Sequence, residues 1–146
     1  MEKRLNIQHA HPAAYKAMFG LEGALASSEL TKIQKELIKI RASQINGCAF
    51  CIDMHTKDAL KYGETTQRIF LLNAWRETDL FTEEEKALLA VTEEVTLIHQ
   101  HGLTTGTYEL AGKFFSEEVL AQIIMAIVAI NAWNRIAIST QLPVAK

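Results

Sequence analysis

Both cysteines of this 146-residue chain lie close to a histidine in one short stretch. Cys48 and Cys51 are three residues apart, and His55 follows four residues after the second cysteine. If the segment from Cys48 onward is helical, the three side chains stand at positions i, i+3 and i+7 and share one helix face. Two thiols and an imidazole in one small volume are suited to dithiol–disulfide chemistry, because the imidazole can take a proton from a thiol.

The spacing of the cysteines permits a disulfide. In a helix, residues three apart have α-carbons about 5 Å apart, inside the roughly 4.4–6.8 Å that disulfide geometry requires. The choice of nucleophile stays open, because a helix N-terminus favours a thiolate at Cys48 whereas the one-turn spacing to His55 favours one at Cys51. The residues are also compatible with a purely structural role, as two small core cysteines and a hydrogen-bonded histidine.

The elements that must position these groups are all helices. No stretch alternates between apolar and polar residues with period two, and Asn46-Gly47 and the capping box that starts at Thr82 mark helix ends. The sequence predicts an all-α bundle of about six to seven helices in a single domain spanning 1–146, with the cysteine-pair core at about 30–63. The expected helices are 12–28, 29–45, 48–62, 66–77, 82–102, 105–115 and 119–140.

Glu36 is a candidate fourth member of the site. It lies about 40° round the helix from Ile40, so it borders the apolar stripe and is expected to be partly buried. A simple hairpin does not bring it to Cys51, because ten residues of helix precede the Asn46-Gly47 turn, about 15 Å, against about 6 Å after it. The contact is expected to need an oblique helix crossing or a neighbouring subunit.

The charge composition of the chain disfavours two classes of binding partner. The chain has 15 Lys+Arg and 17 Asp+Glu, a net charge of −2, and no basic run, so neither nucleic acid nor an anionic membrane is an expected partner. The N-terminus shows no signal-peptide pattern, and the expected location is cytoplasmic. In a reducing cytosol a Cys-x-x-Cys pair is more often catalytic or metal-binding than structural, and two cysteines cannot close a four-ligand zinc site. No metal or bound cofactor is therefore expected.

The last expected helix is apolar around most of its circumference, although polar residues such as Gln122 and Arg135 interrupt it too often for a membrane span. Such a helix must be buried on several sides, within the domain or beneath a partner subunit, which favours a homo-oligomer. Trp75 and Trp133 lie in apolar helices, where core, interface and substrate-lining roles are all open.

The pattern of Glu36, Cys48-x-x-Cys51 and His55 resembles the alkylhydroperoxidase D-like (AhpD-like) proteins of the carboxymuconolactone decarboxylase family. The segments 43–48 and 130–135 are also similar to that family. The cysteine–histidine pattern is typical of its redox branch, because the decarboxylase branch lacks the cysteine pair. One departure is Phe50, which stands where the best-characterised branch has a histidine.

The resemblance implies an all-helical homo-oligomer, a trimer or hexamer, with thiol-dependent peroxidase activity in antioxidant defence. It makes Cys51 the peroxidatic thiol, Cys48 the resolving thiol, and His55 and Glu36 a proton relay. The partners would be a peroxide and an external dithiol or reductase protein that reduces the disulfide. The alternatives are a non-redox enzyme on the same scaffold, such as a decarboxylase, and a non-enzymatic stress protein whose cysteine pair senses oxidants.

Overall fold

The computed structural model describes residues 4–145, and these fold into helices and turns without a β-strand. The all-α prediction is confirmed. Two features raise the number of helices above the expected six to seven: a short helix precedes Pro12, and the segment 66–77 is divided in two. The helices are α1 (Ile7–Ala10), α2 (Pro12–Ala26), α3 (Lys32–Asn46), α4 (Ala49–Lys61), α5 (Thr66–Leu71), the 3-10 helix η1 (Leu72–Glu77), α6 (Glu83–Thr96), α7 (Thr105–Ala111) and α8 (Glu117–Thr140).

Most predicted helix ends are confirmed because the signals for them are local. Gly47 follows α3 in the left-handed region at φ 71°, where a glycine carries no steric penalty. Thr82 forms the predicted capping box with Glu85, since each side chain bonds to the other residue's backbone N–H. These ends set the lengths of the helices that carry the cysteines and the core.

Three predicted boundaries are wrong. Helix α3 begins after Thr31, which forms a capping box with Gln34, and not at residue 29. Helix α6 ends at Thr96 instead of Gly102, because Glu94 near its end accepts hydrogen bonds from the start of α7 and the chain turns there. Helix α7 is correspondingly short and ends at residue 111.

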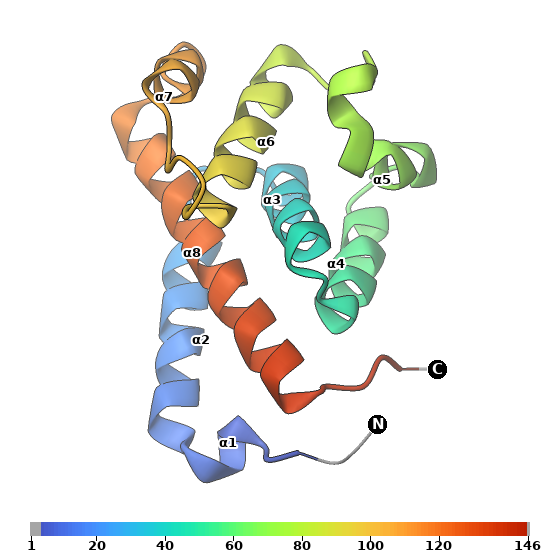
Figure 1. Cartoon of the computed structure of the whole chain (residues 1–146), viewed down its shortest axis with the longest axis vertical. Coiled ribbons are helices and arrows are strands. Elements are labelled where there is room, and N and C mark those ends of the chain that lie inside the picture. Colours follow the sequence, from blue (N-terminus) through green and yellow to red (C-terminus); the bar gives the residue numbers. More distant parts are fainter. Residues whose placement is uncertain (1–3, 146) are drawn as a thin grey trace.

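Helix α3 is the centre of the bundle, between α4 and α8, and α2 runs alongside α8 (Figure 1). It contributes to two apolar clusters: Ile38 and Ala42 pack with α4, α6 and α8, whereas Leu37 and Ile40 pack with α5, η1 and α6. Because opposite sides of α3 are both buried, its position and tilt are fixed by packing over most of its length. The side chains it presents are therefore held rigidly.

Helix α8 is, within residues 4–145, the one helix long and apolar enough to cross a membrane, with 44% of that stretch buried inside the chain. Core helices meet the same criterion. Its Ile123, Ile127 and Ile130 are buried, and Asn134 is wholly inaccessible and hydrogen-bonded to α3. Helix α8 is thus built into the bundle through both apolar and polar contacts.

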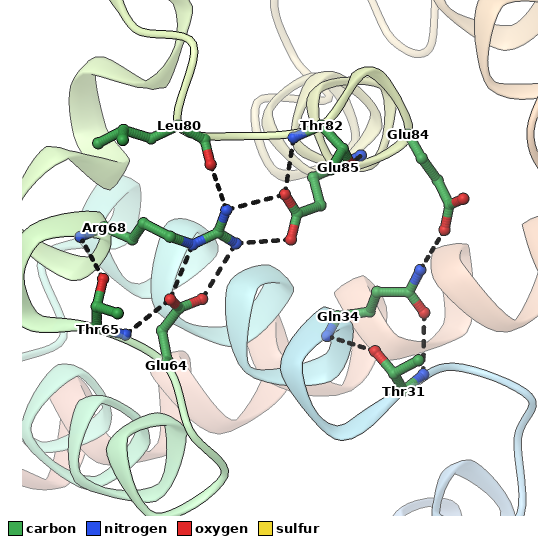
Figure 2. Close-up of polar contacts among 9 residues, drawn as sticks. All are labelled: Thr31, Gln34, Glu64, Thr65, Arg68, Leu80, Thr82, Glu84 and Glu85. Carbon is green, nitrogen blue, oxygen red and sulfur yellow. Dashed lines mark hydrogen bonds and ion pairs between the residues drawn. The ribbon is translucent and has the colours of Figure 1, made fainter.

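A half-buried ion-pair network fixes α5 against α6 (Figure 2). The Arg68 guanidinium lies between the carboxylates of Glu64, 2.8 Å from its Nε, and Glu85, 2.6 Å from an Nη. It also donates to the Leu80 carbonyl. Desolvation by itself would lower the pKa of Arg68, but the two carboxylates raise it above its ordinary value. This network is saturated with hydrogen bonds and permanently charged.

Candidate active site

The two cysteines lie at the turn between α3 and α4. Cys48 is the N-cap residue of α4, and its sulfur accepts a hydrogen bond from the backbone N–H of Cys51 at 3.3 Å. The two residues are 1% and 2% exposed and are joined by a disulfide, with α-carbons 5.4 Å apart. The prediction that the pair can bridge within one helical turn is confirmed.

An amide network holds this turn against α8. Asn46, the last residue of α3, donates to the side-chain oxygens of Asn131 and Asn134, both at 2.9 Å. Asn134 in turn donates to the Ser43 hydroxyl at 2.9 Å. The two segments that carry the family resemblance are therefore in contact, and buried amide bonds of this kind hold a turn in one conformation.

Glu36 and His55 form a buried pair, with exposed fractions of 4% and 7%. His55 Nδ1 lies 2.8 Å from Glu36 Oε2, and Lys39 Nζ lies 3.3 Å from the other oxygen of that carboxylate. The contact forms within one chain, because His55 lies about as many residues after the Asn46-Gly47 turn as Glu36 lies before it, so Glu36 reaches the histidine one turn beyond Cys51. A carboxylate on Nδ1 fixes the ring orientation and leaves Nε2 as the second nitrogen for proton exchange.

A cavity of about 400 Å³ opens between α2, α4 and α8. Cys51 and His55, one turn apart on α4, both line it, whereas Cys48 is not among its described lining residues. A small molecule in the cavity can therefore contact Cys51, whereas Cys48 lies behind it. The lining residues are Tyr15, Phe19, Glu22, Phe50, Cys51, Met54, His55, Trp133, Ile136, Ala137 and Leu142.

Three aromatic rings form one wall of this cavity. Tyr15 and Phe19 of α2 pack against each other with centroids 5.3 Å apart, and each lies 5.5 Å from the ring of Trp133. The indole N–H donates to Glu22 at 2.9 Å, which fixes the plane of the ring. A cavity that is mostly apolar with a few convergent polar groups is the usual form of a small-molecule site.

The comparisons with known proteins agree with this geometry. The model of the carboxymuconolactone decarboxylase family matches residues 12–94, more than half of the chain. The chain belongs to the carboxymuconolactone decarboxylase family. This confirms the resemblance drawn from the cysteine–histidine pattern.

Relatives of this family member share its fold over nearly the whole chain. An uncharacterized protein of Bacillus subtilis, YdfG, is 43% identical over 139 residues, which is 95% of each chain. A crystal structure from Agrobacterium tumefaciens, of a protein of unknown function suggested to be the antioxidant defence protein AhpD, is 42% identical with a TM-score of 0.96 over 99% of each chain. The debrominase Bmp8 is 19% identical with a TM-score of 0.84 over 94% of this chain and 74% of its own, and it shares the fold alone. The chain is thus a single domain of the AhpD-like fold.

One group of side chains in the described part of this family member could hold a metal ion. Glu36, His55 and Asp58 each offer a ligand atom within 4.8 Å of the others. Both carboxylates already face an ammonium group, Lys39 at 3.3 Å from Glu36 and Lys61 at 2.8 Å from Asp58. Positive charges at these positions oppose a divalent cation. The arrangement suits proton transfer through His55 better than metal binding.

The four predicted site residues thus lie together, but sequence reasoning missed the wall contributed by α2. Tyr15, Phe19 and Glu22 stand at i, i+4 and i+7, one helix face, and this spacing was the available signal. Of the two tryptophans, Trp133 lines the cavity, whereas Trp75 is buried elsewhere and donates to Glu93 at 2.8 Å. The substrate-lining option therefore applies to Trp133 alone.

Proposed function

We propose that the protein is a thiol-dependent peroxidase that reduces hydrogen peroxide or alkyl hydroperoxides, with Cys51 as the peroxidatic thiol. The observation that carries this proposal is the asymmetry of the cysteine pair. Cys51 and His55 share the cavity wall, while Cys48 bonds to Cys51 from outside that wall. A peroxide in the cavity meets one sulfur and one imidazole.

The oxidative half-reaction starts from the dithiol. Cys51 gives its proton to His55, whose other nitrogen is held by Glu36, and the thiolate attacks the terminal peroxide oxygen. The O–O bond breaks, the alcohol or water leaves with the proton held by His55, and Cys51 becomes a sulfenic acid. The Cys48 thiol then attacks this sulfur, forming the disulfide and releasing water.

The reductive half-reaction uses the same asymmetry. The thiolate of an external dithiol, free or on a reductase protein, attacks the Cys51 sulfur from the cavity, and Cys48 leaves. The N-cap position of Cys48, where its sulfur accepts the Cys51 N–H, stabilises the departing thiolate, and a more stable thiolate leaves faster. The second thiol of the reductant then releases Cys51. One peroxide and one dithiol give one alcohol, one water and one disulfide, and no bound cofactor is required.

Assembly and location belong to the same proposal: a cytoplasmic homo-oligomer, a trimer or hexamer. Helix α8 supports association, because its Met125, Val128 and Ile138 are 43%, 44% and 45% exposed in the single chain. Large apolar side chains exposed along one helix suit a subunit interface. The mass of the native assembly measures the subunit number.

Thiol labelling before and after one equivalent of hydroperoxide tests the proposal. The chain has only two cysteines, so the label count reports on this pair alone. We expect both thiols to disappear together and peroxide to be consumed repeatedly when a dithiol is supplied. Stoichiometric oxidation without turnover would instead support an oxidant sensor, and unreacted thiols would leave a non-redox enzyme such as a decarboxylase.

Single cysteine variants test the division of roles. Cys51→Ser is expected to abolish peroxide consumption, whereas Cys48→Ser is expected to leave a sulfenic acid on Cys51 that dimedone traps. A sulfenic acid trapped on Cys48 in the Cys51→Ser protein would reverse the assignment. Both serine variants keep the shape of the turn, so folding is checked by their circular dichroism.

A further inference from the structure

A second cavity, of about 250 Å³, lies between the end of α2 and the first turns of α3. Three lysines line it, Lys32, Lys35 and Lys39, together with Ser28. The peroxidase proposal uses none of these groups as a binding site. Their arrangement concentrates positive charge around a space large enough for a small ligand.

The carboxylates in this cavity do not neutralise the lysines fully. Glu22 accepts the Trp133 N–H, and Glu36 is shared between His55 and Lys39. Three ammonium groups therefore face two carboxylates, each of which also serves a group outside the cavity. The lining side chains therefore carry a net positive charge.

The positions of the lysines add to this imbalance. Lys32 and Lys35 lie in the first turns of α3, a helix without an acidic residue in its first turn, where the macrodipole already places partial positive charge. Lys35 and Lys39 are an i, i+4 pair of like charges, an unfavourable spacing. Burial and then the charge of Lys39 lower the pKa of Lys35 below its ordinary value. A bound anion would relieve each of these effects.

The Ser28 hydroxyl points to the same ligand. Among the buried side-chain oxygens and nitrogens of residues 4–145, its Oγ is the one without a hydrogen-bond partner. Leaving a buried hydroxyl unpaired is unfavourable, and such atoms in native proteins usually mark a missing water or ligand. A hydroxyl donor beside lysines is a typical composition for binding an oxyanion.

We propose that this cavity is a binding site for a small oxyanion, carried by free phosphate or by an organic carboxylate. The ammonium groups of Lys35 and Lys39 neutralise it, and the unpartnered Ser28 hydroxyl donates to one of its oxygens after the side chain rotates toward the cavity. Neither cysteine lines this cavity, although Glu22 lines both cavities and Glu36 bonds to His55, so anion binding can be measured apart from peroxide reduction. Binding to the full-length, disulfide-bonded protein is the property to measure.

Titration of inorganic phosphate and, separately, of acetate into the protein in chloride buffer tests the proposal, with backbone amide chemical shifts as the readout. We expect saturable shifts centred on residues 28–39. Lys35→Gln should weaken binding about tenfold or more, because it removes a charged hydrogen-bond partner. Saturation by phosphate alone or by acetate alone would identify which source of oxyanion the site accepts.

Two further variants keep the test specific. Ser28→Ala should weaken binding by about threefold or more without lowering the melting temperature, because the hydroxyl it removes has no partner in the free protein. Lys86→Gln, which removes a lysine paired with Glu83 on α6, should leave binding unchanged. Lys39 is left intact, because it also contacts Glu36. The proposal would be overturned by an absence of saturable shifts. It would also be overturned if the Lys35→Gln and Ser28→Ala proteins both bound the anions as tightly as the wild-type protein does.

Discussion

Two clusters of charged side chains differ in burial and in the role that their chemistry allows, one half-buried around Arg68 and one buried around Glu36 and His55. In the cluster of Glu64, Arg68 and Glu85, a guanidinium that never deprotonates donates to two carboxylates and a carbonyl (Figure 2), and none of the three residues lines the cavity beside Cys51. The cluster of Glu36 and His55 has a histidine that lines a cavity together with Cys51. The Arg68 guanidinium has all its N–H groups hydrogen-bonded and a permanent charge, so it stabilises the fold. His55 has a second ring nitrogen that Glu36 does not occupy, and this nitrogen can transfer a proton.

The largest effect is expected from Arg68→Met. Removing the guanidinium leaves the buried Glu64 and the half-buried Glu85 without their partner, which should lower the free energy of unfolding by about 3 kcal/mol. Denaturation in guanidinium chloride measures this loss. The rate at which peroxide oxidises the thiol pair of the folded variant should stay at the wild-type value.

The control for Arg68→Met is Lys86→Met, which breaks the more exposed pair with Glu83 and should cost about 1 kcal/mol or less. An Arg68→Met protein as stable as wild type would show that the network does not hold α5 against α6.

The Glu36→Gln substitution should change the rate of thiol oxidation strongly and the free energy of unfolding only slightly. The amide can keep a hydrogen bond to His55, so the free energy of unfolding should change by only about 1 kcal/mol. The rate of thiol oxidation by peroxide should fall about 100-fold, the lower end of what general acid–base catalysis contributes, and its pH profile should shift. Stopped-flow kinetics with hydrogen peroxide across pH 5 to 9, about the range in which histidine titrates, measures both effects.

Glu64→Gln is the matched control for Glu36→Gln, because it changes a carboxylate of similar burial in the other cluster. It should lower stability without changing the oxidation rate. Equal oxidation rates in the two variants would remove Glu36 from the proton relay.

The contrast between the clusters also explains what the sequence could predict. Gly47, the Thr82 capping box and the spacing of Cys48 and Cys51 are local signals, and each is confirmed because neighbouring residues alone determine the conformation. The Thr31–Gln34 capping box is equally local, and the predicted helix start ignored it. These features fix the lengths of α3 and α4.

The remaining features depend on how helices cross. Helix periodicity placed Glu36 at the border of the apolar stripe, but only the packing of α3 against α4 shows that its carboxylate bonds to His55. Tyr15 and Phe19 line the cavity because α2 packs along α8, a contact between segments far apart in the chain. The break at Ala74, with φ −120° and ψ 27°, likewise has no glycine or proline to mark it.

A third expected effect is a loss of stability in acid. Burial alone would raise the pKa of Glu85, but hydrogen bonds from Arg68 and Thr82 lower it below 4.5; Glu93 shows the same pattern with Arg76. A carboxyl with a lower pKa in the folded state gives up protons that the unfolded state retains, so its contribution is present above the unfolded value. Stability should therefore fall as the pH drops below about 4.5.

Thermal melting at pH values from about 7 to 3 measures this acid effect. The Arg68→Met variant sharpens it, because Glu85 then loses the partner that lowers its pKa and the melting temperature should depend less steeply on pH. A melting temperature that rises on acidification would contradict the assignment.

The smallest effect should come from Trp133→Phe, which shortens one ring of the aromatic wall while Tyr15 and Phe19 remain. Contacts between aromatic rings contribute about 0.5–1.5 kcal/mol, so kcat/KM for a bulky peroxide such as cumene hydroperoxide should fall about threefold to tenfold. Hydrogen peroxide is too small to use that wall, and its kcat/KM should hardly change. Trp75→Phe is the control, because that ring is buried away from the cavity and hydrogen-bonded to Glu93. It should lower stability and leave the ratio of the two kcat/KM values intact, and an altered ratio in this variant would mean that the cavity does not select the peroxide.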